Sequence, residues 1–254
     1  VISGNNFSWS VNGNFTTNHN EIRQLHPILD NGGDGIIDGY GITMTGGRLG
    51  AFFVPDYAGV NPEYGYEMIY QADQNRYLTD SDGDVLHENG QPLLNPNYLQ
   101  RYRDPVTGEY VKIPASRKNL RNHRIIQKDK TGLPTWFGGI ENNLKWRNFT
   151  FDFLFTYAGG NYIYDLYEEQ TVRIGTGTTL LRHELLTDSW QQPGDQAKYP
   201  KLVWNQQYDV YDDAGNLSSP NIRFDGDGIT RLNGRFLYKG DYLRLRNISL
   251  GYNL

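Results

Sequence analysis

The stretch from Pro134 to Tyr157 constrains the fold of this chain more than any other. In its second half, every second residue is aromatic: Phe149, Phe151, Phe153, Phe155 and Tyr157. Successive side chains of a strand point to opposite faces, so this alternation predicts a strand with one aromatic face. In the first half, Ile140, Leu144 and Trp146 share a face, and Asn142 is the one polar exception.

A two-residue loop at Arg147-Asn148 would fold the two halves into a hairpin. Loop length fixes the register of a hairpin. The expected pairs are Trp146 with Phe149, Leu144 with Phe151, Asn142 with Phe153, and Ile140 with Phe155. This register gathers the large apolar groups on one face. A primed turn favours positive φ at both loop positions, for which Arg-Asn is not the best sequence.

Such an apolar face can be buried in two ways. It can form the inner face of a soluble β-sandwich. It can also face lipid in a transmembrane barrel whose other face lines a polar lumen. A run of Phe with Tyr and Trp at its ends is typical of an apolar band between aromatic girdles, but the hairpin alone does not exclude the soluble sandwich.

Composition narrows the function classes. The chain has 254 residues, 14% of them aromatic, and a net charge of −5, so it has no basic footprint for nucleic acid. It has no cysteine, which excludes disulfides, thiol nucleophiles and cysteine-ligated metals. No apolar run approaches the roughly 18 residues of a membrane helix.

Two further segments alternate in the same way. From Asn6 to Thr16 an apolar face opposes an uncharged polar one, and from Gly240 to Leu254 apolar and polar residues alternate again. About ten tilted strand residues cross the apolar band of an outer-membrane barrel. Two long polar regions, Thr17 to Leu133 and Ala158 to Lys239, separate these strands and suit large external loops.

The terminal segment GDYLRLRNISLGYNL, Gly240 to Leu254, resembles the C-terminal signature of SusC/RagA-type TonB-dependent outer-membrane transporters. The order of the preceding motifs resembles that family too: Phe7-Ser8-Trp9, Asn18 to Ile22, Gly47 to Tyr57, Gly59 to Gly65, Pro134 to Gly139, Tyr157 to Gly160, Pro193-Gly194-Asp195 and Tyr199-Pro200. The resemblance implies an all-β fold, namely an antiparallel transmembrane β-barrel segment with long extracellular loops.

The chain does not open with a start or a targeting segment, so we expect residues 1–254 to be the late part of a larger barrel. The family's plug domain, its TonB-contacting segment and its closing strands are missing from this sequence. The resemblance implies import of a glycan or peptide through the outer membrane of a Gram-negative bacterium. Its implied partners are a SusD-like surface lipoprotein, TonB through the missing N-terminal part, and the remainder of the barrel. The alternative is a soluble secreted β-sandwich that binds carbohydrate.

Aromatic residues of the two polar regions are the candidate ligand contacts. Flat rings with a polar group suit sugar faces and peptide side chains, and they are favoured at interfaces. The candidates are Tyr57, Tyr64, Tyr162, Tyr164, Trp190 and Trp204. The alternative is that these rings pack the loops against one another.

Asp80, Asp82 and Asp84 form a short acidic loop with spacing i, i+2 and i+4. Clustered carboxylates bind hard cations such as calcium, which makes this loop a speculative calcium site; otherwise no cofactor is expected. Tight turns use the same residues, and Asp225 to Gly228 is a similar stretch. No nucleophile, metalloprotease or phosphate-loop motif is present, so we expect no enzyme.

Overall fold

The computed structural model describes residues 1–172, 182–224 and 232–254. Five strands form one antiparallel sheet with the order β1-β2-β12-β13-β18, which we call the barrel sheet. Its strands are β1 (Ile2–Gly4), β2 (Phe7–Thr17), β12 (Trp136–Trp146), β13 (Phe149–Gly159) and β18 (Tyr242–Tyr252). Neighbours in this sheet are consecutive along the chain once residues 18–135 and 160–241 are set aside. We call these two ranges together the loop body.

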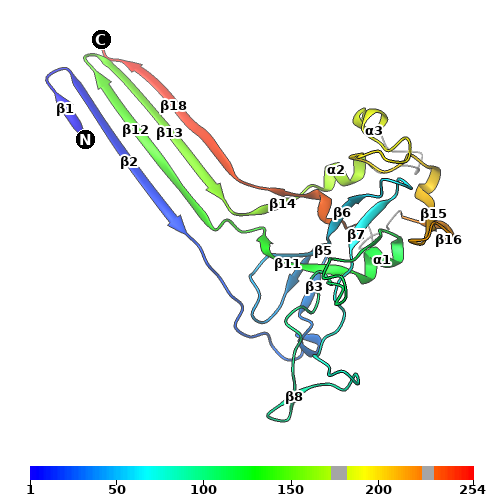
Figure 1. Cartoon of the computed structure of the whole chain (residues 1–254). Helices are drawn as coiled ribbons and strands as arrows, with labels where there is room; N and C mark the ends of the chain where they lie inside the picture. Colours follow the sequence, from blue (N-terminus) through cyan, green and yellow to red (C-terminus); the bar gives the residue numbers. More distant parts are fainter. Residues whose placement is uncertain (173–181, 225–231) are drawn as a thin grey trace.

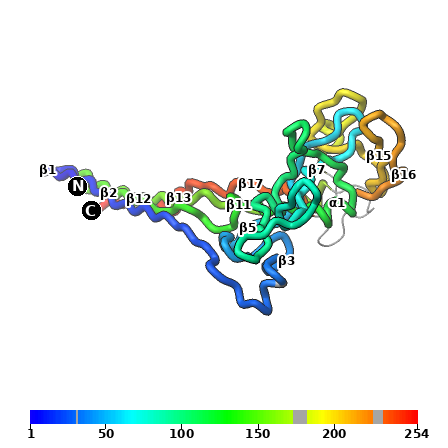
Figure 2. Tube along the Cα trace, turned by 60° about the horizontal axis from the view of Figure 1, so that its bottom comes forward, coloured from blue at the N-terminus to red at the C-terminus, as the bar shows by residue number. Residues whose placement is uncertain are grey.

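The sheet projects from the loop body as a long ribbon, and both chain ends lie at its far end (Figure 1). A second view shows the same extended ribbon and the same compact body (Figure 2). The turn between β12 and β13 lies beside the turn between β1 and β2, because the Arg147 N–H donates to the Asn6 carbonyl at 2.8 Å. Both parts of the loop body therefore leave the barrel sheet at its opposite end.

The predicted hairpin register is confirmed. β12 and β13 pair through Trp146 with Phe149, Leu144 with Phe151, Asn142 with Phe153, and Ile140 with Phe155. Only Arg147 of the two loop residues has a positive φ, 53°. That pattern belongs to a turn with positive φ at its first central position, rather than at both.

β18 brings its apolar residues to the same face by means of a bulge. Leu154 pairs with Asn247 and Phe155 with Leu245, so Arg246 is an extra residue in the ladder. A one-residue bulge reverses the alternation of a strand. Without it, Leu243 and Leu245 would face away from Ile248, Leu250 and Tyr252.

The aromatic face of the barrel sheet is uncovered in the part of the chain that the structure describes. Phe15 is 65% exposed, Trp146 56% and Leu250 74%. A soluble sandwich would cover such a face with a second sheet. Large exposed apolar area at this scale instead marks a surface for lipid or another protein. The face therefore favours the barrel over the soluble sandwich.

Polar groups on this face are satisfied locally. Asn142, the exception in the apolar pattern, accepts a hydrogen bond from the Trp9 indole N–H at 3.2 Å. Near the loop end, the Tyr157 hydroxyl crosses above Gly138 and donates to the Asn14 carbonyl at 2.8 Å. A Cβ atom at Gly138 would lie 2.6 Å from that hydroxyl oxygen, so the contact requires glycine. Unpaired polar groups are costly in lipid, and these contacts avoid that cost.

The opposite face of the barrel sheet is polar, as predicted. Glu141 lies opposite Leu154, Asn143 opposite Asp152 and Lys145 opposite Thr150. On β18, Arg244 lies opposite Thr156. Alternation of an apolar and a polar face is the arrangement of a barrel wall between lipid and a polar lumen.

The loop body contains the hydrophobic core. Its first part holds η1 (Asn31–Gly33), β3 (Ile36–Asp38), β4 (Gly41–Thr43), β5 (Ala51–Pro55), β6 (Tyr57–Val60), β7 (Glu67–Tyr70), β8 (His87–Glu88), β9 (Gln91–Pro92), β10 (Lys112–Pro114), α1 (Arg117–Asn122) and β11 (Arg124–Thr131). Its second part holds β14 (Tyr162–Tyr164), α2 (Leu166–Thr171), α3 (Glu184–Thr187), η2 (Trp204–Gln206), β15 (Gln207–Tyr211), β16 (Leu217–Arg223), η4 (Gly234–Phe236) and β17 (Leu237–Lys239).

The core consists of three buried clusters, of which the first two unite the two parts and the third lies within the first part. One cluster joins Tyr66 and Ile69 to Tyr208 and Phe224, and a second joins Phe52 and Val54 to Tyr164, Leu232 and Phe236. The third consists of Ile42, Ala51, Phe53 and Ile126. The sequence suggested loops with little regular structure here. The structure instead shows small packed sheets, because residues far apart in the chain bury one another.

None of the helices in the described residues is both long and apolar enough to cross a membrane.

Candidate functional site

The six candidate ligand-contact residues all lie in the loop body. Three of them lie in short strands of the loop body: Tyr57 belongs to β6, and Tyr162 and Tyr164 form the ends of β14. Trp204 opens η2. The other two, Tyr64 and Trp190, lie in connecting segments.

Tyr64 and Trp190 pack against protein groups. The Tyr64 ring stacks on Tyr211 with ring centroids 4.4 Å apart. Trp190 is 6% exposed, and its indole N–H donates to the Pro62 carbonyl at 2.8 Å. Gly65, with φ of +78°, lets that indole approach the backbone, because a Cβ there would lie 2.5 Å from the ring. Both residues stabilise the fold of the loop body.

Tyr164 is buried in the second cluster and stacks on Tyr40 at 5.1 Å. Its hydroxyl donates to the Glu169 carboxylate at 3.2 Å and accepts from the Asn233 N–H at 3.2 Å. Burial raises the pKa of Tyr164 above its usual value, and the nearby Glu169 carboxylate adds to this effect. The hydroxyl therefore remains protonated and links β14, α2 and the segment before η4.

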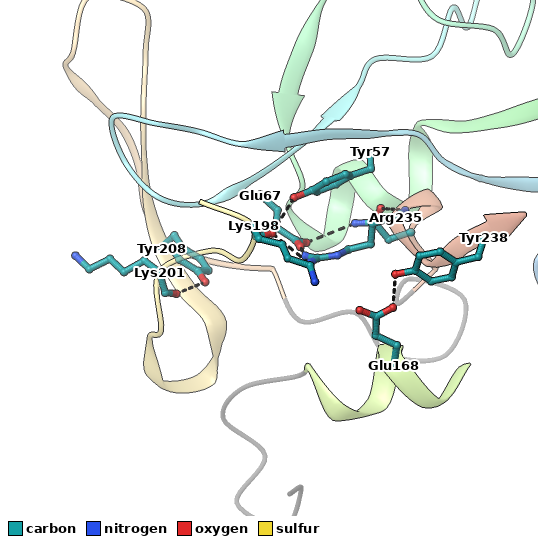
Figure 3. A network of polar contacts seen from close by, with 9 residues as sticks. Tyr57, Glu67, Glu168, Lys198, Lys201, Tyr208, Arg235 and Tyr238 are labelled. Carbon is teal, nitrogen blue, oxygen red and sulfur yellow. Dashed lines mark hydrogen bonds and ion pairs between the residues drawn. The ribbon is translucent and has the colours of Figure 1, made fainter. Parts of the chain in front are cut away.

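A partly buried ion pair between Glu67 and Arg235 lies at the centre of a polar cluster (Figure 3). It joins β7 of the first part to η4 of the second. The Arg235 guanidinium also lies 5.0 Å from the Tyr57 ring centroid, and it donates to the Lys198 carbonyl at 3.4 Å. Burial lowers the pKa of Arg235, but Glu67, Tyr57 and Tyr199 together more than offset this effect, so the net shift of the pKa is upward.

Tyr57 covers this ion pair. Burial raises the pKa of its hydroxyl to about 12, and the Glu67 carboxylate contributes to the rise. That hydroxyl donates to the Lys198 carbonyl at 3.5 Å. Tyr57 is therefore a partly buried neighbour of Arg235.

A second carboxylate, Glu168 of α2, lies close by (Figure 3). It accepts a hydrogen bond from the Tyr238 hydroxyl, and Arg182 lies 3.4 Å from its other oxygen. Burial and this hydrogen bond raise the pKa of Tyr238 to about 12. Glu67 is paired with Arg235, and Glu168 is paired with Arg182 and Tyr238. The polar cluster therefore holds the two parts of the loop body together.

Of the six candidates, Trp204 is the most exposed, at 73%. Tyr162 is half-buried beside the second cluster, with the Lys130 ammonium 5.8 Å from its ring centroid. The rings of Tyr64, Tyr164 and Trp190 are engaged in packing. Ligand contact stays a prediction for all six residues.

The acidic loop at Asp80 forms a turn. The Asp80 carboxylate accepts the backbone N–H groups of Asp82 at 3.0 Å and Asp84 at 2.9 Å. This is the hydrogen bonding by which Asp stabilises a tight turn. Within residues 1–172, 182–224 and 232–254, no three His, Asp or Glu side chains are grouped to hold a metal. Calcium binding stays an untested prediction, and Asp225 to Gly228 lies outside the described residues.

Glu67, Arg235 and Arg124 are key residues of the loop body that no sequence motif indicates. Arg124 is buried and donates to the carbonyls of Phe53 at 2.8 Å and Gly39 at 2.6 Å. Burial lowers the pKa of Arg124 to about 10. Isolated charged residues in short strands belong to no motif, so no sequence signal distinguished them.

Two known proteins are similar in sequence to this chain along almost its whole length. No family model matches the chain. TonB-dependent receptor P39 of Formosa agariphila is 25% identical over 270 residues, covering 99% of this chain and 22% of the relative. TonB-dependent receptor P3 of the same organism is 24% identical over 262 residues, covering 100% and 20%. Both relatives are receptors by name rather than enzymes, and this chain spans about a fifth of their length.

Solved structures show the same fold. The RagAB peptide transporter matches with a TM-score of 0.61 at 19% identity, covering 99% of this chain and 21% of that chain. The RagAB peptide importer in its open-open state matches with a TM-score of 0.60 at 17% identity and the same coverage. The predicted fold, an antiparallel transmembrane β-barrel segment, is confirmed.

Proposed function

We propose that this chain, a barrel segment of a SusC/RagA-type TonB-dependent receptor, takes part in importing a large nutrient across the outer membrane of a Gram-negative bacterium. The relatives that match along almost its whole length support this function. The observation that carries it is the barrel sheet, which has an uncovered apolar face, a polar face, and a loop body at one end only. An outer-membrane barrel has a lipid-facing apolar band, a polar interior and long loops on one side of the membrane.

Orientation follows from the lengths of the connections. Outer-membrane barrels have short periplasmic turns and long extracellular loops. The turn at Arg147-Asn148 is therefore periplasmic, and the loop body is extracellular. β2 and β13 run outward, while β12 and β18 run inward. The incoming nutrient then meets the loop body first.

The nutrient class we propose is an oligosaccharide or a peptide, as the family resemblance implies. Half-buried and exposed rings of the loop body, such as Trp204, support contact with either class. The resemblance also implies a SusD-like lipoprotein above the loop body and energy from TonB through other parts of the receptor. The buried cluster around Arg235 would hold the loop body rigid beneath such a lid.

Uptake by cells tests this function. The complete receptor that contains this segment is expressed, with its partner lipoprotein, in a Gram-negative host that lacks its own copy. We expect accumulation of a fluorescent peptide or oligosaccharide mixture, and we expect a protonophore to abolish it because TonB requires the proton gradient. If the receptor reaches the outer membrane and neither mixture accumulates, the proposed function is wrong.

A further inference from the structure

We propose that a basic groove of the loop body binds acidic peptides, an inference that rests on the proposed import function and narrows its nutrient class. The groove has a volume of about 710 Å³ and lies between α1 and the β15–β16 hairpin. Its walls therefore come from both parts of the loop body, at the end remote from the barrel sheet (Figure 1).

The charge of this groove differs from that of the chain. Among the described residues, eleven line the groove; four of them are Lys or Arg and none is Asp or Glu, whereas the chain as a whole carries −5. The four are Arg117, Lys118, Arg121 and Arg223. Charges of one sign gathered in a concave surface raise the local concentration of oppositely charged ligands. The groove therefore favours an anionic ligand.

Two of these cations, Lys118 and Arg121, lie on the exposed side of α1. The Ser116 hydroxyl caps the helix by accepting the Asn119 N–H at 3.2 Å, and Leu120 anchors it in the first cluster with 4% exposure. Lys118 and Arg121 are exposed, and residues three apart share a helix face. Among the described residues, neither has a carboxylate within ion-pair distance.

The stability of α1 does not account for these charges. Arg117 and Lys118 occupy its first turn, which holds no acidic residue. The helix dipole disfavours cations at that end. Residues that oppose local preferences are typical of functional sites.

The uncharged lining favours a peptide over a sugar. The apolar walls are Pro114, Val210 and Ile222, all aliphatic, and no aromatic ring is among the lining residues that the structure describes. Sugar faces pack on aromatic rings, whereas aliphatic walls suit aliphatic side chains. Hydroxyl and amide groups of Ser219 and Asn122 also line the groove and suit peptide backbone. An acidic peptide with aliphatic residues fits all of these features.

Binding to the complete receptor in detergent tests the proposal. The probe is a fluorescent hexapeptide of alternating Glu and Val, and the matched probe has Gln in place of Glu. We expect the Glu peptide to bind about tenfold more tightly in low salt and to lose that advantage in high salt, because salt screens exposed charges. Equal affinity of the two peptides would overturn the proposal.

Two double variants test whether the Glu peptide binds in the groove. Lys118→Ala with Arg121→Ala should remove the tenfold preference for Glu. Lys128→Ala with Lys239→Ala removes two exposed charges outside the groove and should keep it. Equal effects of the two double variants would refute the groove as the site. A circular dichroism spectrum and a melting temperature confirm that both fold.

Two controls separate other outcomes. If tetragalacturonate displaces the Glu peptide at lower concentration than unlabelled peptide does, the ligand is an acidic glycan and the peptide assignment is wrong. If the groove variant keeps peptide binding but no longer copurifies with its partner lipoprotein, the groove is a lid contact instead. Uptake of a neutral peptide by the groove variant is measured alongside, because persisting uptake would leave the import function standing while the groove proposal fails.

Discussion

The barrel sheet and the loop body place their large apolar side chains in opposite ways. In the barrel sheet these side chains lie on an uncovered face, with Phe15 65% and Leu250 74% exposed. In the loop body they fill buried clusters, and Val54 and Ile69 are fully buried. One chain is thus adapted to two solvents: lipid stabilises the sheet, and exclusion from water stabilises the body.

Polar groups also differ between the two regions. In the barrel sheet, Asn142 on the apolar face has one side-chain partner, Trp9 of the adjacent strand β2. In the loop body, Glu67 and Arg235 form an ion pair between the first and the second part. The first contact lies within one sheet, whereas the second holds two separate insertions together.

The largest effect is expected for Arg235→Met in the loop body. This change leaves the partly buried Glu67 carboxylate without its cation, which costs at most about 3–5 kcal/mol, the range for a fully buried pair. Limited proteolysis of the loop body should accelerate, while the barrel keeps its heat-modifiable migration on gels. Adding Glu67→Gln should restore part of the loss, and Arg103→Met, at an exposed site, should have little effect. Loss of barrel assembly in Arg235→Met would contradict the separation of the two regions.

A smaller effect is expected for Phe153→Arg on the apolar face of the barrel sheet. Arginine facing lipid near the midplane costs about 2–4 kcal/mol. Thr156→Arg on the polar face should be mild, although it lies opposite Arg244.

Leu154→Arg is the closest control for Phe153→Arg, because it is the adjacent residue, faces the lumen and lies opposite Glu141. Folding yield into lipid vesicles measures all three variants. Similar yields for Phe153→Arg and Leu154→Arg would refute the assignment of faces.

Asn142→Ala should cost about 1–2 kcal/mol, because it leaves the Trp9 indole N–H without an acceptor on the lipid-facing side of the sheet. The double variant with Trp9→Phe removes donor and acceptor together. Unfolding of the barrel by urea from vesicles gives the coupling energy of the pair. A coupling of zero would show that the contact does not satisfy the indole in the membrane.

The smallest effect concerns His123 at the end of α1. Burial lowers the pKa of His123, and its Nδ1 lies 3.3 Å from the Ala72 N–H. The folded state therefore favours neutral His123, so its stabilisation is complete above the usual pKa of about 6.5 and is lost as pH falls below that value. The protection factor of the Ala72 amide against hydrogen exchange, corrected for the intrinsic rate at each pH, should fall at acidic pH. His123→Asn should flatten that dependence and His87→Asn, at an exposed site, should not; the reverse result would exclude His123 as the cause.

The β12–β13 hairpin of the barrel sheet could be predicted from sequence to the level of register, because the information that sets it is local. Alternation assigns each residue of β12 and β13 to a face, and a two-residue turn then fixes the pairs. The bulge at Arg246 was missed. Its signal is present, since the apolar spacing changes from two to three between Leu245 and Ile248.

The loop body could not be predicted in the same way. Its strands are short, and the partners of Glu67, Tyr164 and Arg124 lie in distant segments. No periodic pattern encodes such contacts. The aromatic residues chosen as ligand contacts were selected by type alone, and type does not distinguish the buried Trp190 from the exposed Trp204.

The proposed orientation puts the loop body outside the cell and the hairpin turn in the periplasm. Single cysteines at Asn89, Asn216 and Asn148 test it directly, because the chain has no cysteine of its own and all three positions are exposed. A membrane-impermeant thiol reagent on intact cells should label the first two and leave Asn148→Cys unlabelled until the outer membrane is opened. Labelling of Asn148→Cys alone on intact cells would invert the topology and contradict the account.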